Sequence, residues 1–246
     1  MTMKSGKGTL ALALLAATCG TASAAIPTVS FAVNGAGASG GSTLSGNAVP
    51  GSPGQYQYIG TAVAPQAFFC SVELHATESA SPYRMAFGGL VTLINSSSST
   101  QDYVVDITAS TLAQGGGSVI GGSFSGVLTA GTAGPAAFGV GNGSAGWTGL
   151  VDGLGVHSMM TSPQTVTAAA FGTAAIPART FGLPIPSMPS GAIGNTMGTR
   201  LAFSLSAGAK VDLTSVFVLQ YAPAIPAPGA LVAMVAMAAA PRRRRA

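Results

Sequence analysis

Apolar side chains alternate with small or polar ones at every second residue in several stretches of this chain, and this period of two constrains the fold most. Residues 68–75 put four apolar side chains on one face and four other side chains on the opposite face: Phe68, Cys70, Val72 and Leu74 against Phe69, Ser71, Glu73 and His75. A period of two is the signature of a β-strand with one buried face. Because no helical period of 3.6 residues persists between the two ends of the chain, we expect an all-β fold, an antiparallel β-sandwich or jelly roll.

Further strands are expected where the alternation returns. These stretches are 28–33, 83–94, 102–108 with Tyr103, Val105 and Ile107 inward, 164–171, 201–205 and 211–221. The last two are separated by Ala207-Gly208-Ala209, which predicts a hairpin. Short hairpins are expected between Gln114 and Gly149, where glycines interrupt apolar pairs.

Two segments are expected to lack strands. Residues 34–54 are rich in Gly, Ala, Ser and Pro, a composition typical of a flexible loop or linker. Residues 176–198 contain four prolines and four glycines, which predict a long irregular loop because proline removes a ladder donor.

The N-terminal end has the order of a cleaved export signal. Lys4 and Lys7 precede an apolar core from Leu10 to Ala17, and Ala22-Ser23-Ala24 offers the small-x-small pattern that signal peptidase accepts. We expect residues 1–24 to be removed, with the mature chain starting at Ala25. A lipoprotein anchored through Cys19 is the alternative, although Ala16-Ala17-Thr18 lacks the usual leucine before the cysteine.

The C-terminal end, residues 225–246, is also organised as a targeting signal. A short motif containing Pro226, Pro228 and Gly229 precedes an apolar run over 230–240 and a cluster of four arginines: Arg242, Arg243, Arg244 and Arg245. Arginines resist transfer through a bilayer, so the positive-inside rule would leave this cluster in the cytoplasm while the body of the protein lies outside.

This tail resembles the PEP-CTERM sorting signal, with Pro-Ala-Pro-Gly in place of the Pro-Glu-Pro motif. The resemblance implies recognition of Pro226, Pro228 and Gly229 by an exosortase-type membrane protease. It also implies that residues 230–240 cross the inner membrane transiently and that Arg242 to Arg245 hold the tail at its cytoplasmic face. The resemblance covers only residues 225–246, and it concerns sorting rather than the activity of the domain before it.

Charge excludes a nucleic-acid partner for the body of the chain. Six of the ten basic residues lie in the two ends, so four basic residues face six acidic ones over 25–222. No basic surface remains there to contact phosphates. Charged residues make up 7% of the chain, against roughly 25% in ordinary globular proteins. Ser, Thr, Gly, Asn and Gln must therefore fill the surface, as in many secreted β proteins.

Cysteine use fits an exported chain without disulfides. Once Cys19 leaves with the signal, Cys70 is alone in the mature chain and is expected to be a buried apolar residue. Residues 25–222 are long enough for one sizeable β-sandwich.

Glycine-rich matches to catalytic or nucleotide-binding motifs carry little weight. Gly35-x-Gly37-x-x-Gly40 and Gly141-x-Gly143-x-x-Gly146 match a dinucleotide fingerprint, but no helix is expected after either. Gly37-x-Ser39-x-Gly41 matches a hydrolase nucleophile elbow without the strand-turn-helix context.

Polar side chains suggest few sites. Glu73 and His75 share a strand face and suggest a metal ligand pair or an acid/base pair, with two solvated side chains as the simpler reading. His157 has no partner identifiable from sequence. Asp102 and Asp106 should point outward about 13 Å apart, too far to share a metal. Asn95-Ser96-Ser97 and Asn142-Gly143-Ser144 fit the glycan acceptor pattern.

Three functions remain in view. The first is a non-enzymatic, exported bacterial cell-envelope or extracellular-matrix protein, without a cofactor, that is sorted through its tail. The second is a carbohydrate-binding module that binds an extracellular polysaccharide by stacking on exposed aromatic residues: Trp147, Tyr56, Tyr58, Tyr83 or Tyr103. The third is a hydrolase, which requires His75 or His157 to lie against Ser, Asp or Glu in a cleft.

Overall fold

The computed structural model describes residues 25–132, 134–141 and 143–222, and the described chain is built from strands. In chain order they are β1 (Val29–Gly35), β2 (Ala38–Leu44), β3 (Asn47–Ala48), β4 (Gln55–Ala64), β5 (Phe68–Ala80), β6 (Tyr83–Asn95), β7 (Gln101–Ser110), β8 (Ser118–Thr129), β9 (Ala136–Val140), β10 (Ala145–Val151), β11 (Leu154–Thr161), β12 (Gln164–Ala168), β13 (Thr173–Phe181), β14 (Met188–Ser190), β15 (Thr196–Leu205) and β16 (Lys210–Tyr221).

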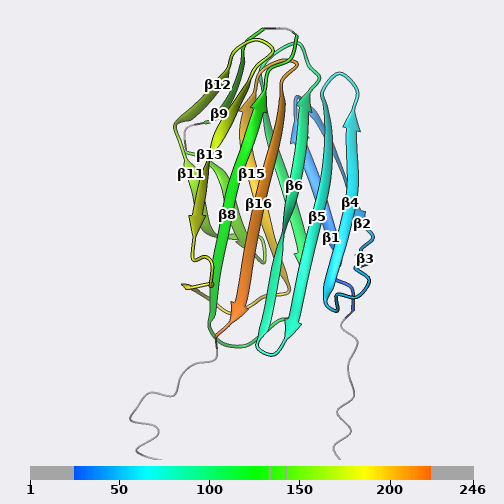
Figure 1. Cartoon of the computed structure of the whole chain (residues 1–246), viewed down its shortest axis with the longest axis vertical. Helices are drawn as coiled ribbons and strands as arrows, with labels where there is room; N and C mark the ends of the chain where they lie inside the picture. The colour runs from blue at the N-terminus through cyan, green and yellow to red at the C-terminus, as the bar shows by residue number, and fades with distance from the viewer. Residues whose placement is uncertain (1–24, 133, 142, 223–246) are drawn as a thin grey trace, which may run out of the picture.

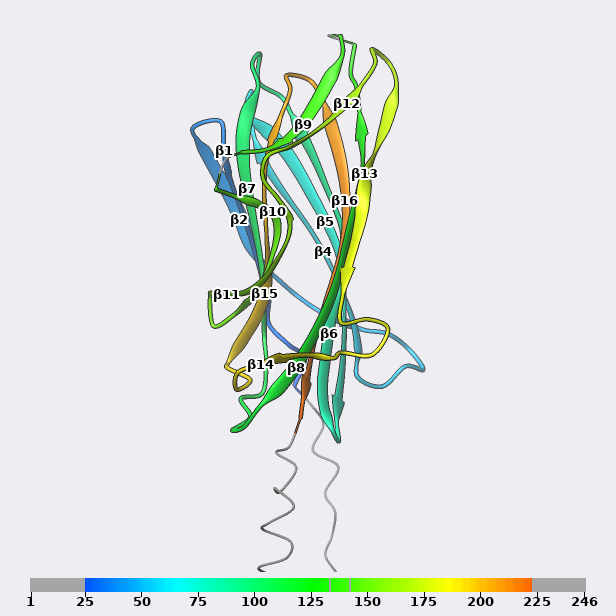
Figure 2. The same cartoon turned by 90° about the vertical axis from the view of Figure 1, so that its left-hand side faces the viewer.

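The strands form two antiparallel sheets packed face to face, so the predicted β-sandwich is confirmed (Figures 1 and 2). Sheet A has the order β11-β10-β15-β7-β1-β2, with β9 pairing β15 and β12 pairing β9. Sheet B has the order β13-β8-β16-β6-β5-β4-β3, with β14 also pairing β8. Strand β1 begins and β16 ends at the same end of the sandwich, the lower end in Figure 1.

The strands predicted from clear alternation are confirmed with their faces. In β5, Phe68, Cys70, Val72 and Leu74 are buried and the intervening side chains face outward. In β7, Tyr103, Val105 and Ile107 are buried, as expected. Each sheet therefore contributes one apolar face, and the two faces meet to form a single core.

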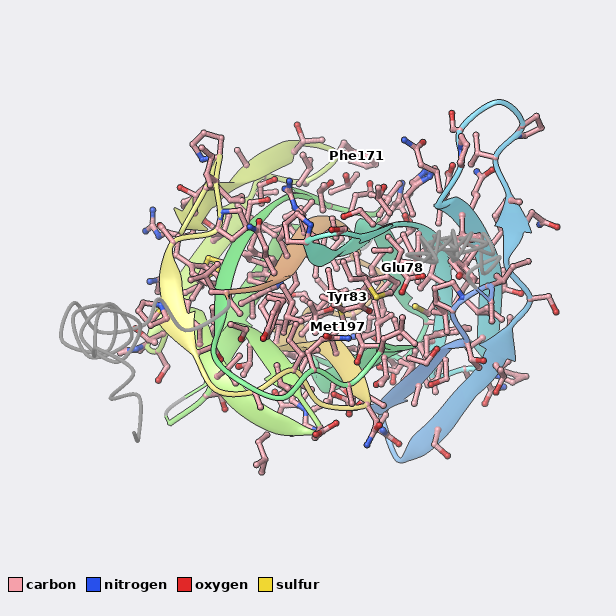
Figure 3. All side chains as sticks on the ribbon, turned by 90° about the horizontal axis from the view of Figure 1, so that it is seen from below. Glu78, Tyr83, Phe171 and Met197 are labelled. Atoms are coloured by element: carbon pink, nitrogen blue, oxygen red, sulfur yellow. The ribbon has the colours of Figure 1, made fainter. Side chains whose placement is uncertain are left out.

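Aromatic rings link the two sheets through this core. Tyr103 of sheet A meets Phe68 of sheet B edge-on at 6.1 Å between ring centroids, and Trp147 of sheet A meets Phe217 of sheet B at 5.8 Å. Such edge-to-face pairs contribute about 0.5–1.5 kcal/mol beyond the burial of their area. In the view from below, Tyr83 and Met197 lie inside the molecule, whereas Phe171 lies at its border (Figure 3).

The prediction of a loop over residues 34–54 is wrong, because strands β2 and β3 lie within this segment. Ala36 and Gly37 both have positive φ, 54° and 72°, which gives the two-residue turn that matches strand twist. Strand β2 then pairs with β1 along its whole length. Most of its side chains face solvent, so its ladder needs no apolar alternation, and composition alone concealed it.

The structure also corrects the hairpins expected over 114–149. Strand β8 is one twelve-residue strand held between β16 and β13, with three glycines inside it. Gly121 and Gly122 allow close approach, because a Cβ at Gly121 would lie 2.3 Å from the carbonyl oxygen of Gly182. Glycine here marks tight packing rather than a turn.

The irregular loop expected over 176–198 is interrupted by strands. It contains the end of β13, all of β14 and the start of β15. Pro177 is tolerated because β13 is an edge strand whose register shifts between Ile176 and Arg179.

The two strands predicted over residues 201–221 are present, but they do not pair with each other as the predicted hairpin would. Strand β15 pairs with β7 and β10 in sheet A, whereas β16 pairs with β6 and β8 in sheet B. The Ala207–Ala209 turn therefore crosses between the sheets. Asn95 fixes this crossing: its backbone bonds to Ala209 and Gly208, and its buried Nδ2 donates to the carbonyl oxygen of Leu205 at 2.8 Å.

We expect Gly88→Ala to lower the free energy of unfolding by about 1–3 kcal/mol. A Cβ at Gly88 in β6 would lie 2.2 Å from the backbone oxygen of Ser215 in the neighbouring strand, so the β6–β16 ladder would have to shift. Urea unfolding of the full chain measures this effect. Gly115→Ala is the matched control, because nothing lies within 4 Å of the added atom. Equal losses in both variants would contradict the close approach.

Candidate functional site

A shallow hollow lies on the outer face of sheet B, where Gly88 leaves the surface without a side chain. It has a volume of about 250 Å³ and is lined by residues of β5, β6 and β16: His75, Thr77, Ala86, Phe87, Gly88, Gly89, Thr214 and Val216. Its walls are mainly apolar, and His75 supplies an imidazole. The hollow exists because backbone crowding against Ser215 requires glycine at position 88. The Gly88-Gly89 pair inside an alternating strand was the sequence signal for it.

Glu73 and His75 lie beside this hollow on β5, as the alternation predicted. Gln57 of β4 donates from Nε2 to Glu73 Oε1 at 3.2 Å, and His75 Nε2 lies 4.0 Å from the same oxygen. The imidazole–carboxylate distance is too long for a hydrogen bond. Both side chains are more than half exposed, so water screens their attraction. The arrangement is that of solvated polar side chains on a sheet face.

His157 of β11 lies on the opposite side of the sandwich, against Phe181 of β13. The two ring centroids are 3.9 Å apart and the ring planes are inclined at 37°, so the contact bridges the edges of sheets A and B. Trp147 of β10 also packs against Phe181, with 5.8 Å between the ring centroids. Desolvation by burial lowers the pKa of His157 below its usual value. No hydrogen bond joins His157 to a Ser, Asp or Glu side chain among the described residues.

The two aspartates of β7 are not brought to a common site. Asp106 forms a two-point ion pair with Arg200 of β15, at 2.7 Å to Nε and 3.1 Å to NH2. Arg200 and Asp106 are direct cross-strand neighbours, a pairing that only the tertiary register could reveal. Asp102 lines a separate hollow of about 290 Å³ beside Ser144 and Ala202. Over the described ranges, no group of three or more His, Cys, Asp or Glu side chains could hold a metal ion.

The aromatic residues proposed as a sugar platform are buried, and this expectation is wrong. Trp147 and Tyr58 are 0% exposed, and the other three have little more exposure: Tyr103, Tyr83 and Tyr56. Tyr58 donates to the carbonyl oxygen of Pro27 at 2.7 Å, and Tyr83 accepts from the backbone N–H of Leu112 at 3.0 Å. Desolvation by burial raises the pKa of Tyr58, Tyr83 and Tyr103 to about 12. These rings hold the core together, so they are inaccessible to a polysaccharide.

The glycine-rich motifs lie in turns and strands. Gly35, Gly37 and Gly40 belong to the β1–β2 hairpin, and Ser39 is on β2, so neither a phosphate-binding helix nor a nucleophile elbow follows. Gly141 and Gly143 lie between β9 and β10, and Gly146 lies within β10, again a strand.

Asn95, the acceptor of the first glycan pattern, is not accessible to a glycan. Asn95 is 0% exposed, and its Nδ2 donates to the carbonyl oxygens of Ser99 and Leu205. The amide nitrogen that a glycan would need is therefore committed inside the fold. Asn142 lies outside the described residues.

The residues predicted to act in targeting also lie outside the described residues. This applies to the predicted signal-peptidase site at Ala22 and Ala24, to the predicted sorting motif at Pro226, Pro228 and Gly229, and to the arginines at 242–245. In the part of the chain that is described, no helix is long and apolar enough to cross a membrane. No protein-family model matches the sequence, and no curated protein matches it either.

We expect the pKa of His157 to lie below 6.5 in the folded protein. Because the unfolded chain then binds a proton more readily, stability should fall as pH drops through about 6.5, and the loss should be complete below the folded pKa. NMR titration of the His157 ring measures the pKa. Phe181→Ala opens the contact and should move the pKa back toward 6.5. A folded pKa at or above 6.5 would contradict the burial.

We expect the Cys70 thiol to be inert in the native protein. It is 0% exposed, and burial raises its pKa to about 12, so almost no thiolate exists at neutral pH. A thiol reagent added to a C19S variant should react only after denaturation. Rapid reaction of the folded protein would show that the core opens at β5.

Proposed function

We propose that this chain is a non-enzymatic, exported bacterial protein of the cell envelope or extracellular matrix, carried there by its two ends. The sequence supports the route: a signal peptide over 1–24 and a Pro-Ala-Pro-Gly, apolar and arginine tail over 225–246. On this proposal signal peptidase removes the first segment. An exosortase-type membrane protease then acts near Pro226 to Gly229 while the tail crosses the inner membrane.

The observation that carries the proposal is the position of β16. This last strand of the fold lies between β6 and β8 in sheet B and pairs with β8 from Lys210 to Tyr221. It pairs with β6 from Lys210 to Gln220. A pull on the chain beyond Tyr221 would load both ladders in shear, so many hydrogen bonds would have to break together. A domain tethered by its C-terminus benefits from such an attachment.

The arrangement of the ends supports the same reading. Strand β1 begins and β16 ends at the lower end of the sandwich (Figure 1), so a body tethered there projects its opposite end away from the membrane. The surface supports an extracellular setting, because Ser, Thr and Gly fill positions that charged residues fill in most globular proteins. The five aromatic residues on which the carbohydrate-binding alternative depends are buried in the core, so they offer no stacking surface for a sugar.

We expect mature protein recovered from native cells to begin at Ala25 and to lack residues Arg242 to Arg245. Terminal peptide mass spectrometry of cell-surface material measures both ends. Pro228→Ala should leave the arginines in place, because it removes part of the recognition motif. Pro223→Ala, outside that motif, should not. Surface protein that keeps all four arginines would overturn the processing route.

We expect replacement of Arg242 to Arg245 by Ser to mislocalise the protein, since charge that resists transfer would no longer hold the tail. Cell fractionation measures this effect. R84S/R179S is the control, because it removes positive charge from exposed positions of the sandwich instead. Unchanged fractionation of the tail variant would show that the arginines play no part in sorting.

A further inference from the structure

We propose that a second copy of this chain pairs with the free edge of β4, so that two copies of sheet B join into one antiparallel sheet through residues 58–64. This inference is independent of the sorting route, because it concerns only the described sandwich.

The edge of β4 that faces away from β5 has no hydrogen-bonded strand over most of its length, and β2 of sheet A packs against β4 from the inner side, with Gly40 near Ala62 and Leu44 near Gly60. Strand β5 pairs with β4 from Gln55 to Ala64, whereas β3 on the other side covers only Tyr56 and Gln57. Above β3, β4 forms the border of the molecule in Figure 1. Strand β5 is therefore the only hydrogen-bonded strand neighbour of residues 58–64 in the described chain. Unpaired backbone groups along a strand are a template for another strand.

The edge strands β13 and β11 are protected against such pairing. Strand β13 carries Pro177, Arg179 and a shift in register between Ile176 and Arg179. Strand β11 shifts register opposite Gly149/Leu150, and its Met160 has a positive φ of 55°. These are the devices by which natural sheets keep their edges from associating.

Strand β4 has none of these protections and exposes apolar side chains instead. Gln55–Ala64 contains no charged residue and no proline. Ile59 is 67% exposed and Val63 is 60% exposed, both on the outer face of sheet B. By contrast, edge strand β2 exposes Ser and Thr side chains and buries its one large apolar residue, Leu44.

A second copy fits this edge because the strand is complementary to itself. In an antiparallel pair centred on Thr61, Ile59 of each copy lies opposite Val63 of the other, so two apolar pairs form on one face. Val63 already begins an apolar row with Phe69 and Ile94 on the neighbouring strands, and Ile59 of the second copy would extend that row.

Charge also favours the pairing of two identical edges. The nearest charged side chain on this face is Glu73 of β5, directly beside Ile59. In the joined sheet, the two copies of Glu73 are at least three strand spacings apart, about 14 Å. This separation exceeds the screening length of about 8 Å at physiological ionic strength. No like charges therefore oppose each other across the junction.

Sedimentation of the full-length chain over a range of concentrations tests the proposal. We expect reversible dimerisation, and we expect I59K/V63K to weaken it at least tenfold because lysines would then oppose lysines. L154K/I185K is the matched control, since both residues are 73% exposed but lie away from β4. A monomeric wild type, or equal weakening by both variants, would overturn the proposal.

A charge swap tests the register. I59K/V63K mixed with I59E/V63E should form a heterodimer that each variant alone does not form, and added salt should weaken it. Thr61→Cys in a C19S background should give a disulfide-linked dimer, since Thr61 would lie opposite its own copy at a distance a disulfide can span. Thr77→Cys on β5 is the exposed control and should not cross-link.

Failure of T61C to cross-link, or a T77C cross-link that forms as readily as that of T61C, would overturn the β4 register. An unchanged mass in every variant, together with loss of binding to an added extended peptide in I59K/V63K, would show that the edge serves a foreign strand. That outcome would also overturn the proposal.

Discussion

The antiparallel ladder that holds β16 between β6 and β8 is the interaction on which the rest of the molecule depends. It joins residues 210–221 to segments more than eighty residues earlier, so β6 and β8 become part of one sheet only when β16 lies between them. The close approach of these strands explains why Gly88, Gly122 and Gly126 carry no side chain, since a Cβ at each would lie within 3.0 Å of another atom of the fold. It also fixes Phe217 against Trp147, and thereby sheet B against sheet A.

This internal organisation limits what the surface can do. Most large aromatic residues are buried between the sheets, with Phe171 as an exposed exception, and the ionisable groups on the outside form isolated contacts such as Asp106 with Arg200. The surface offers two other features, the shallow hollow over Gly88 and the edge of β4 that has no hydrogen-bonded partner. These features suit contact with other surfaces, and they are consistent with a body that is delivered and held by its ends.

Much of the fold could be predicted from residue patterns. Strands with one buried face, such as β5 and β7, were recognised with their inward side chains, because burial selects apolar residues at every second position. Strand β2 was missed because it lies at an edge, where its hydrogen bonds come from β1 and few of its side chains need to be apolar. The glycines of β8 predict hairpins, whereas in the fold they allow close packing within one long strand. The roles of Trp147 and Asn95 were missed because an isolated aromatic or amide side chain gives no local sign of whether it will be buried.

The sequence by itself determined the all-β class and the faces of the regular strands, because each of these follows from a local order of residue types. The targeting role of the two ends is a prediction from the same kind of local order. Only the tertiary structure decided which strands pair. Residues 201–205 and 211–221 look like a hairpin along the chain, yet they lie in different sheets. Each strand has two edges that any other strand can satisfy with the same backbone hydrogen bonds. The choice among those partners depends on how all the apolar faces close into one core, and that is a property of the whole chain.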